Sequence, residues 1–321
     1  RDFCLSRGLG DVYKRQYLMR KILLNLEIST KCRAACSMCP RKHVPKNKFI
    51  DDDLVNIISK ELDDTFWEID LSGRGEPTLH PKFHELSRII KNNSNTQLAV
   101  VTTADNLTDK VNDTFREYID VIRLSVSSYD EKIFKKVHCG LNYNKIWDNI
   151  KRLGNEHAYK TVIHLTGGSV IYEGLEITVE KLREIGFREF RLFPLWNRAG
   201  DNEVKAKEEE FRHDIIEKLG LRSSESEYDG GNSSDYINDY KRNKLTNPKY
   251  CIVGDSSLFI TYNGDILGCF QDFSGKCIVA NIRNSNLKDI IKHKKDKVGR
   301  YEFCSNCNSN IAILNLSLIH I

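Results

Sequence analysis

The chain has 321 residues, of which 40% are apolar and 29% charged, a composition typical of a folded globular protein and too apolar for a disordered one. Its net charge is +4, from 49 basic and 45 acidic residues, so composition gives no reason to expect nucleic acid or an anionic membrane as partner. No stretch approaches the roughly 18 apolar residues of a membrane span, and no secretion signal is recognisable. We therefore expect a cytoplasmic protein.

The two ends of the chain look foreign to the rest of it. Residues 1–18, ahead of Met19, and residues 316–321 resemble translated cloning or adaptor sequence, and we expect neither segment to belong to the native fold. The chain also contains ten cysteines. In a reducing cytoplasm, cysteines bind metals or act in catalysis more often than they form disulfides.

Strand-like apolar runs alternate with charged helical segments over residues 19–200. The predicted strands are residues 22–28, 67–71, 97–102, 121–126, 161–165 and 189–193. The predicted helices are residues 52–62, 81–92, 108–118, 130–137, 143–153 and 175–185. This alternation predicts an α/β fold with a parallel sheet, and six units are too few for a closed eight-stranded barrel. We predict a partial (β/α)6 TIM-like barrel, with an open doubly wound sheet as the alternative.

A second, smaller unit follows the barrel. Residues 201–250 are predicted to be a linker, helical and charged over residues 201–220 and rich in Ser, Gly, Asn and Asp over residues 222–236. Apolar runs at residues 257–262 and 265–270 then flank Asn263 and Gly264, which predicts a β-hairpin with a type I′ turn. A helix is predicted at residues 286–294. We therefore expect a small domain over residues 251–315.

Three cysteines follow the first predicted strand. Cys32, Cys36 and Cys39 have the spacing Cys-x3-Cys-x2-Cys. Ligands of parallel α/β sheets bind where strands end. Three thiolates can hold one metal centre and leave a coordination position open, whereas a structural zinc site has four ligands. A zinc loop that borrows a distant fourth ligand is the alternative.

This spacing resembles the signature of the radical S-adenosylmethionine (SAM) superfamily. The resemblance implies that Cys32, Cys36 and Cys39 hold a [4Fe–4S] cluster, and that SAM chelates its fourth iron. Residues 72–77, Ser-Gly-Arg-Gly-Glu-Pro, are similar to that family's Gly-Gly-Glu-Pro element, with Arg74 in place of the first glycine. By this resemblance, SAM is bound by Gly73, Gly75, Glu76, Pro77 and, on the fourth strand, Ser125.

Four further cysteines accompany the predicted hairpin. Cys251 precedes it, Cys269 follows it, and Cys304 and Cys307 form a Cys-x-x-Cys pair. The pattern resembles the C-terminal extension called SPASM, in its shortened form called Twitch. The resemblance implies that these cysteines hold one auxiliary [4Fe–4S] cluster. Four cysteines also suit a structural zinc ribbon, which stays open as the alternative.

The resemblance implies a reaction. A flavodoxin- or ferredoxin-type reductant supplies an electron, SAM is cleaved to a 5′-deoxyadenosyl radical, and the radical abstracts hydrogen from the substrate. An auxiliary cluster with four cysteine ligands has no open iron, so we expect it to accept the second electron of an oxidation. Arg198, after the sixth strand, is the predicted catalytic residue, because its guanidinium would hold a substrate hydroxyl or the SAM carboxylate. A surface salt bridge is the alternative.

Two substrate classes fit this reaction. One is a small sugar or cyclitol oxidised at an alcohol, and the other is a ribosomally made peptide. We favour the small molecule, because no leader-binding domain of the kind that peptide modifiers carry is recognisable ahead of Met19. A function of another class, a non-catalytic zinc- or Fe–S-binding module, would also account for the cysteines.

Overall fold

The computed structural model describes residues 22–196, 198, 208–223, 251–295, 297 and 299–307. The ends predicted to be non-native, residues 1–18 and 316–321, lie outside the described residues, as do residues 224–250 of the predicted linker. None of the described helices is both long and apolar enough to cross a bilayer.

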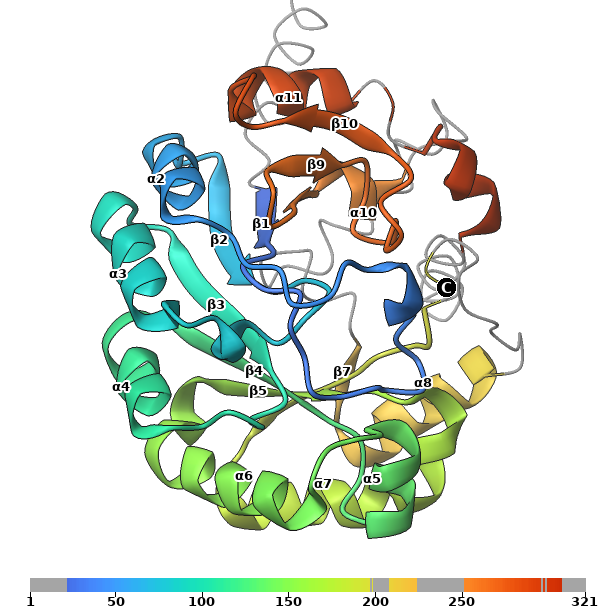
Figure 1. Cartoon of the computed structure of the whole chain (residues 1–321). Coiled ribbons are helices and arrows are strands. Elements are labelled where there is room, and N and C mark those ends of the chain that lie inside the picture. Colours follow the sequence, from blue (N-terminus) through green and yellow to red (C-terminus); the bar gives the residue numbers. More distant parts are fainter. Residues whose placement is uncertain are drawn as a thin grey trace, which may run out of the picture.

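Parallel strands in chain order form the centre of the sheet and curve into an incomplete barrel (Figure 1). They are β1 (Ile22–Leu26), β2 (Phe66–Leu71), β3 (Gln97–Thr102), β4 (Val121–Val126), β5 (Thr161–Leu165) and β6 (Glu189–Leu192). The helices on its outer face are α2 (Asp52–Lys60), α3 (Phe83–Asn93), α4 (Asp109–Tyr118), α5 (Glu131–Val137), α6 (Tyr143–His157) and α7 (Leu175–Ile185). The predicted partial α/β barrel is confirmed.

Side-chain caps determine where the outer helices begin. Thr108 accepts a hydrogen bond from the Val111 amide, and Asp130 accepts from the amides of Lys132 and Ile133. Both residues satisfy amides that the first helical turn leaves unpaired. They therefore stand just outside α4 and α5, although the sequence prediction included them in the helices.

The sheet continues beyond the six predicted strands at both edges. The two-residue strand β7 (Arg222–Ser223) pairs with β6, within a stretch predicted to be a loop. At the other edge, β8 (Ser257–Ile260) runs parallel to β1 and leads into antiparallel β9 (Asp265–Leu267) and β10 (Ile278–Asn281). The C-terminal hairpin therefore extends the barrel sheet directly, which local sequence patterns do not reveal.

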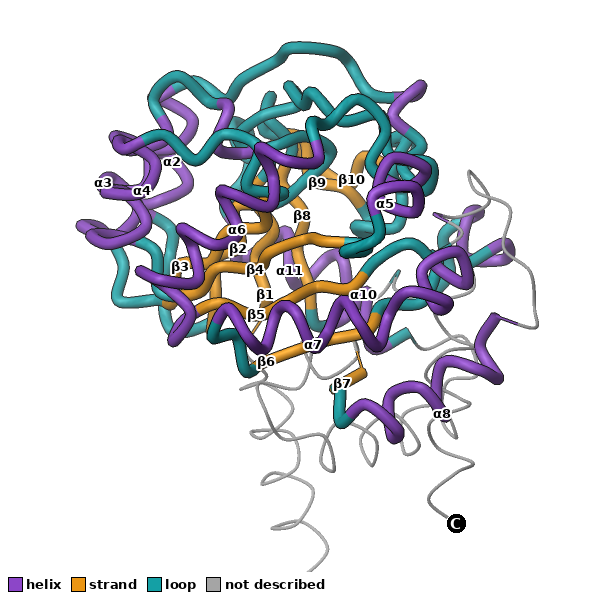
Figure 2. Tube along the Cα trace, turned by 90° about the horizontal axis from the view of Figure 1, so that it is seen from below, coloured by secondary structure: helices purple, strands orange, loops and turns teal. Residues whose placement is uncertain are grey.

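Shorter helical elements complete the described chain. The α-helices are α8 (Glu208–Leu219), α10 (Ile252–Asp255) and α11 (Leu287–Lys295). The 3-10 helices are η1 (Arg41–His43), η2 (Pro77–Leu79), η3 (Ala158–Lys160), η4 (Gly168–Gly174) and η7 (Glu302–Asn306). Figure 2 shows the loops that follow the barrel strands gathered at one end of the molecule.

The hairpin turn differs from the predicted type I′ turn. A type I′ turn needs positive φ at both central residues, but only Gly264 has it, at 88°. The Gly264 amide donates to the Thr261 carbonyl, and the Thr261 amide donates to the Asp265 carbonyl, both at 2.9 Å. This is a three-residue loop with a left-handed glycine. Asn263 keeps a negative φ because its side chain bonds Thr261 and Asp265.

Side chains on the barrel strands alternate in character. The residues that pack against the helices are apolar and fully buried, for example Leu24, Ile69 and Leu124. Their neighbours along the strands face the barrel interior, and many of these are polar: Asn25, Glu68, Asp70, Arg123, Ser125 and His164. Arg123 lies 2.7 Å from Glu68 and 3.6 Å from Asp70. The interior is thus a polar site and not a packed core.

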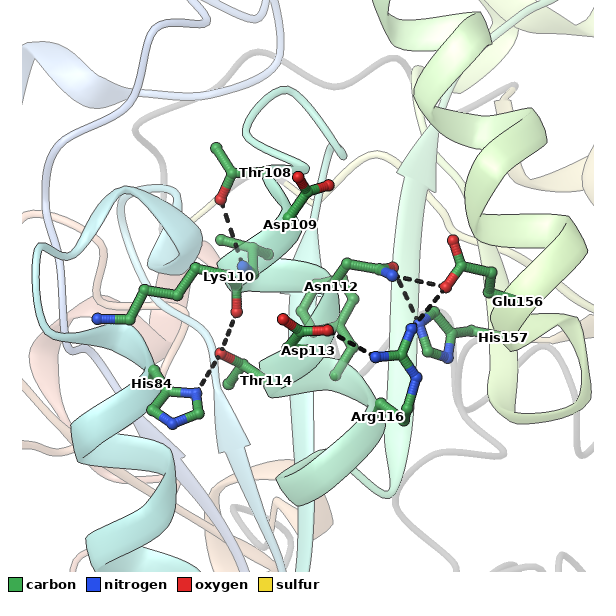
Figure 3. A network of polar contacts seen from close by, with 12 residues as sticks. His84, Thr108, Asp109, Lys110, Asn112, Asp113, Thr114, Arg116, Glu156 and His157 are labelled. Atoms are coloured by element: carbon green, nitrogen blue, oxygen red, sulfur yellow. Dashed lines mark hydrogen bonds and ion pairs between the residues drawn. The ribbon is translucent and has the colours of Figure 1, made fainter.

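A polar network ties α4 to α6 on the outside of the barrel (Figure 3). The side-chain amide of Asn112 donates through Nδ2 to Glu156 at 2.6 Å, and Asn112 Oδ1 lies 3.0 Å from His157 Nε2. Arg116 donates to Glu156 at 2.8 Å and to Asp113 at 2.6 Å. Asn112 and His157 are buried, so the bond between them is shielded from water, whereas the Arg116 bonds are exposed.

We predict that Asn112→Ala lowers the free energy of unfolding by about 1–3 kcal/mol, because it leaves the buried His157 without its partner. Asp113→Ala is the matched control, since it removes only an exposed bond to Arg116 and should leave the urea midpoint almost unchanged. Urea unfolding followed by circular dichroism measures both. Equal shifts of the urea midpoint in Asn112→Ala and Asp113→Ala would contradict this prediction.

Candidate active site

A cavity of 290 Å³ lies at the carboxyl ends of the barrel strands. Its inner wall carries Asn25, Asp70, Ser125 and His164, all from strands. Other parts of the chain also contribute to its lining. Cys36, Met38 and Cys39 come from the loop after β1, and the aromatic residues Trp196, Phe259, Phe270 and Phe273 come from the segment after β6 and from the C-terminal unit.

The cysteine loop is held in shape by Arg41. Its guanidinium donates to the carbonyls of Thr30, Cys32 and Ala34, at 2.9, 3.2 and 3.5 Å. These bonds fold the backbone around one side chain, so the loop does not depend on regular secondary structure for its conformation. The sequence analysis did not single out Arg41, and a lone arginine among several basic residues gives no signal of this role.

The three thiols of this loop lie close enough together to influence one another. Burial, with the neighbouring thiols adding repulsion, raises the pKa of Cys36 to about 12. Burial also raises the pKa of Cys39 to about 11, although the Arg198 and Arg41 charges oppose it. The pKa of Cys32 is raised by burial and by the Glu76 carboxylate. Burial thus favours the protonated thiols when no metal is bound, and a metal that they bind must displace the protons.

These residues fit an iron–sulfur cluster by their chemistry. Thiolate sulfur is the ligand type of such clusters, and the loop presents sulfur atoms to a cavity with room for a small molecule. Among the described residues, no group of three or more His, Cys, Asp or Glu side chains is placed to hold a metal ion. The assignment of Cys32, Cys36 and Cys39 as ligands accordingly remains a prediction.

The glycine-rich loop after β2 packs tightly against the end of β1. A Cβ atom on Gly75 would lie 2.3 Å from the Ser29 carbonyl oxygen, and one on Gly73 would lie 2.7 Å from Glu27 Cβ. Only glycine fits such close approaches. Gly73 lines the cavity, whereas Pro77 is buried at the start of η2.

Glu76 ties this loop to the loop after β3. Its carboxylate accepts hydrogen bonds from the hydroxyls of Thr78, Thr102 and Thr103, at 2.7, 2.8 and 3.0 Å. The Thr103 amide donates to it as well, at 2.9 Å. Glu76 therefore positions two loops beside the cavity, and its predicted contact with SAM remains a prediction.

Arg74, which replaces a glycine of the family element, is buried in an ion pair with Glu27. Its Nε and Nη2 donate to the two Glu27 carboxylate oxygens at 2.7 and 2.8 Å. Its Nη1 also donates to the Phe273 carbonyl at 3.3 Å. The Tyr262 amide donates to the same carboxylate at 3.4 Å. Arg74 and Glu27 thus connect the glycine-rich loop to the C-terminal unit.

Ser125 and Arg198 both reach the cavity, as the sequence analysis expected. The Ser125 hydroxyl lies 3.3 Å from that of Thr166. Arg198 has a φ of 49°, and its guanidinium carbon lies 5.4 Å from the ring of Phe273 and 5.9 Å from that of Phe270. These distances are within cation–π range. Its location suits the catalytic role that the sequence predicts, and the role itself remains a prediction.

The second set of cysteines surrounds the hairpin. Cys269 is buried, and burial together with the charges of Cys251 and Cys307 raises the pKa of its thiol. Burial and Cys307 raise the pKa of Cys304. These thiols are near enough for their charges to interact, although they are up to 56 residues apart in sequence, but no three of them form a group placed to hold a metal ion among the described residues. Their role as cluster ligands remains a prediction.

A buried lysine lies beside this second set. Lys294 donates through Nζ to the carbonyls of Gly254, at 2.7 Å, and Ser257. Burial lowers its pKa, while Cys269, Asp255 and Cys251 oppose that shift. Sequence analysis missed Lys294, and it missed Asp70 and His164 as well. The sequence does indicate that Asp70 and His164 face the barrel interior, because polar residues recur at alternate positions of strands that are otherwise apolar.

Two family models match the chain. One describes the radical SAM superfamily and matches residues 26–182, and the other describes the SPASM iron–sulfur cluster-binding domain and matches residues 251–308. The chain belongs to the radical SAM superfamily. Its cofactors are therefore a SAM-binding [4Fe–4S] cluster, an auxiliary Fe–S cluster and SAM, as predicted.

Curated relatives share part of the chain. A GTP 3′,8-cyclase of Haemophilus influenzae is 27% identical over 194 residues, which are 59% of this chain and 52% of the cyclase. A SAM-dependent 2-deoxy-scyllo-inosamine dehydrogenase of Niallia circulans is 29% identical over 69 residues, which are 18% of this chain and 28% of that enzyme. The chain thus spans about half the length of the cyclase.

Solved structures of radical SAM enzymes share the fold. Streptococcus suis SuiB bound to its precursor peptide SuiA has a TM-score of 0.67 at 15% identity, covering 94% of this chain and 73% of SuiB. BtrN in complex with AdoMet and 2-DOIA has a TM-score of 0.58 at 18% identity, covering 90% of this chain and 93% of BtrN. At these identities the likeness shows the fold alone.

We predict that Arg74→Met lowers the free energy of unfolding by about 3–5 kcal/mol, because it leaves the Glu27 carboxylate buried without its cation. Lys110→Met, which removes an exposed pair with Glu85, is the matched control and should change stability little. Adding Glu27→Leu to Arg74→Met should recover part of the loss. Urea unfolding of the three variants checks this, and an Arg74→Met effect no larger than that of Lys110→Met would refute it.

Proposed function

We propose that this radical SAM enzyme carries out a two-electron oxidation of a small hydroxylated molecule such as a sugar or cyclitol. Cys32, Cys36 and Cys39 would hold the SAM-binding cluster. When bound and reduced, that cluster supplies the electron that cleaves SAM to a 5′-deoxyadenosyl radical. The proposal includes a cytoplasmic location and a flavodoxin- or ferredoxin-type electron donor.

One observation carries the proposal: the two cysteine regions border the same cavity. Cys36 and Cys39 line one side of it, and Phe270 and Phe273, which follow Cys269, line another. A substrate in the cavity would therefore lie between the two predicted cluster sites. This arrangement supports electron transfer from an oxidised substrate to an auxiliary cluster held by Cys251, Cys269, Cys304 and Cys307.

The cavity favours a small polar substrate. Its volume of 290 Å³ is at the lower end of the range of ligand pockets. Asn25, Asp70 and His164 on its wall offer hydrogen bonds to hydroxyl groups. Asp70 and His164 are also able to accept the proton that an alcohol loses when it becomes a ketone. The aromatic residues of the lining, with Trp196 among them, exclude water from a reactive intermediate.

Peptide modification is the second candidate. Its support is the TM-score of 0.67 with SuiB bound to a precursor peptide, against 0.58 with BtrN. Transfer of deuterium into 5′-deoxyadenosine separates the two classes. A deuterated cyclitol or sugar that labels 5′-deoxyadenosine supports the proposal, whereas labelling only from a deuterated peptide would replace it with the second candidate.

We predict roughly eight irons per chain in the anaerobically reconstituted protein, as two [4Fe–4S] clusters require, and roughly four in the variant Cys32→Ala/Cys36→Ala/Cys39→Ala. With dithionite, the parent should convert SAM to 5′-deoxyadenosine and the variant should not. The variant Cys139→Ala, which removes a thiol outside the predicted ligand sets, is the control. About four irons in both proteins would refute the radical mechanism, and zinc in place of iron would favour a non-catalytic module.

A further inference from the structure

We infer that His138 is a positioning residue for the SAM-binding cluster, whose imidazole donates a hydrogen bond from Nδ1 to the Cys36 sulfur and thereby raises the reduction potential of the cluster. The inference rests on the proposed function, because it takes Cys36 as a cluster ligand. It concerns a residue outside the cysteine motif and outside the glycine-rich loop.

Two backbone hydrogen bonds bring the segments of Cys36 and His138 together. The Ala35 amide donates to the Cys139 carbonyl at 2.7 Å, and the Ser37 amide donates to the Val137 carbonyl at 2.9 Å. Cys36 lies between the two donors of these bonds, and His138 lies between the two acceptors. The two bonds hold the segments close together, and Cys36 Sγ lies 3.2 Å from His138 Nδ1.

His138 is held rigidly where it stands. It is the C-cap residue that follows α5, its amide donates to the Phe134 carbonyl at 2.7 Å, and its ring centroid lies 5.2 Å from that of Phe134. The side chain is 1% exposed. Its Nε2 is buried and has no hydrogen-bond partner among the described residues. The contact of Nδ1 with Cys36 is therefore the polar contact that the imidazole ring makes in this part of the structure.

The chemistry of a ligating cysteine sets the direction of the hydrogen bond. A thiolate bound to iron has no proton to donate, so the sulfur can only accept. The proton of the neutral imidazole must then reside on Nδ1. A ligand that bonds in this way to a buried imidazole is oriented by it, as histidine ligands are oriented by their own hydrogen-bond partners.

The hydrogen bond favours the reduced cluster. Reduction adds negative charge to the cluster and its sulfur atoms, and an N–H group pointing at sulfur stabilises that charge. Hydrogen bonds to sulfur and exclusion of solvent both determine cluster potentials. His138 is buried, so the hydrogen bond that it donates is not exchanged readily for one from bulk water. Removing the donor should therefore make the cluster harder to reduce.

The test compares potentials in the full reconstituted chain. His138→Phe keeps a ring and removes the donor, whereas His138→Asn places an amide N–H near the position of Nδ1. His157→Phe is the matched control, since it removes a hydrogen bond of another buried histidine, between α4 and α6 (Figure 3). Redox titration followed by electron paramagnetic resonance measures the potential of the first cluster. Its signal is identified as the one that is missing from the variant Cys32→Ala/Cys36→Ala/Cys39→Ala.

At a fixed solution potential, we expect the ratio of reduced to oxidised cluster to fall about tenfold in His138→Phe. This corresponds to a midpoint potential lower by about 59 mV. His138→Asn should recover most of the loss, and His157→Phe should match the parent. An unchanged potential in His138→Phe would overturn the inference, as would an equal fall in His138→Asn, which would indicate packing. Absence of the signal in the parent would instead refute the proposed function.

A measurement on the parent protein covers the case in which His138→Phe does not retain its cluster. Protein labelled with 15N-histidine should show a weak 15N coupling in the electron–nuclear double resonance spectrum of the reduced first cluster. The coupling should be missing in His138→Asn, in which the donor is unlabelled. A parent spectrum without 15N coupling would overturn the inference by itself.

Discussion

The alternation of side chains along the barrel strands is the constraint on which the rest of the structure depends. Parallel strands covered by helices must place apolar groups on the outer face, and Leu24, Ile69 and Leu124 do so without exposure. The inner face does not pack against helices, so its side chains need not be apolar, and in this protein many of them are polar. Arg123 pairs with Glu68 and approaches Asp70, so buried charges compensate one another and the barrel keeps a cavity where a packed core would otherwise stand.

The loops at the cavity are connected to one another by specific polar contacts. Arg41 folds the cysteine loop through three backbone carbonyls, and Glu76 joins the loops after β2 and β3. Arg74 and Glu27 extend these contacts to the C-terminal unit. Because these contacts are buried or partly buried, movement of one loop would leave a charged group of another loop without its partner. The cavity wall is therefore held as a single arrangement, as a site that must position a reactive group requires.

The candidate ligands could be named from the sequence because their motifs are local, and their roles as ligands remain predictions. The spacing of Cys32, Cys36 and Cys39, and the glycines before Glu76, are short-range patterns that need no knowledge of the fold. The strand–helix alternation likewise predicts the barrel, because each unit has its own hydrophobic period. The hairpin was also predicted, but with the wrong turn type, since Asn263 and Gly264 suit type I′ until the side-chain bonds of Asn263 to Thr261 and Asp265 are considered.

The sequence by itself determined the family, the class of cofactor and the order of the barrel elements, since these depend on residue types and on periods within a few residues. The tertiary structure alone decided which distant residues meet. The pairing of β8 with β1, the contact of Arg74 with Phe273 and the contact of His138 with Cys36 join segments far apart in sequence. Such contacts arise from the packing of the whole sheet, and no local pattern encodes packing between distant segments.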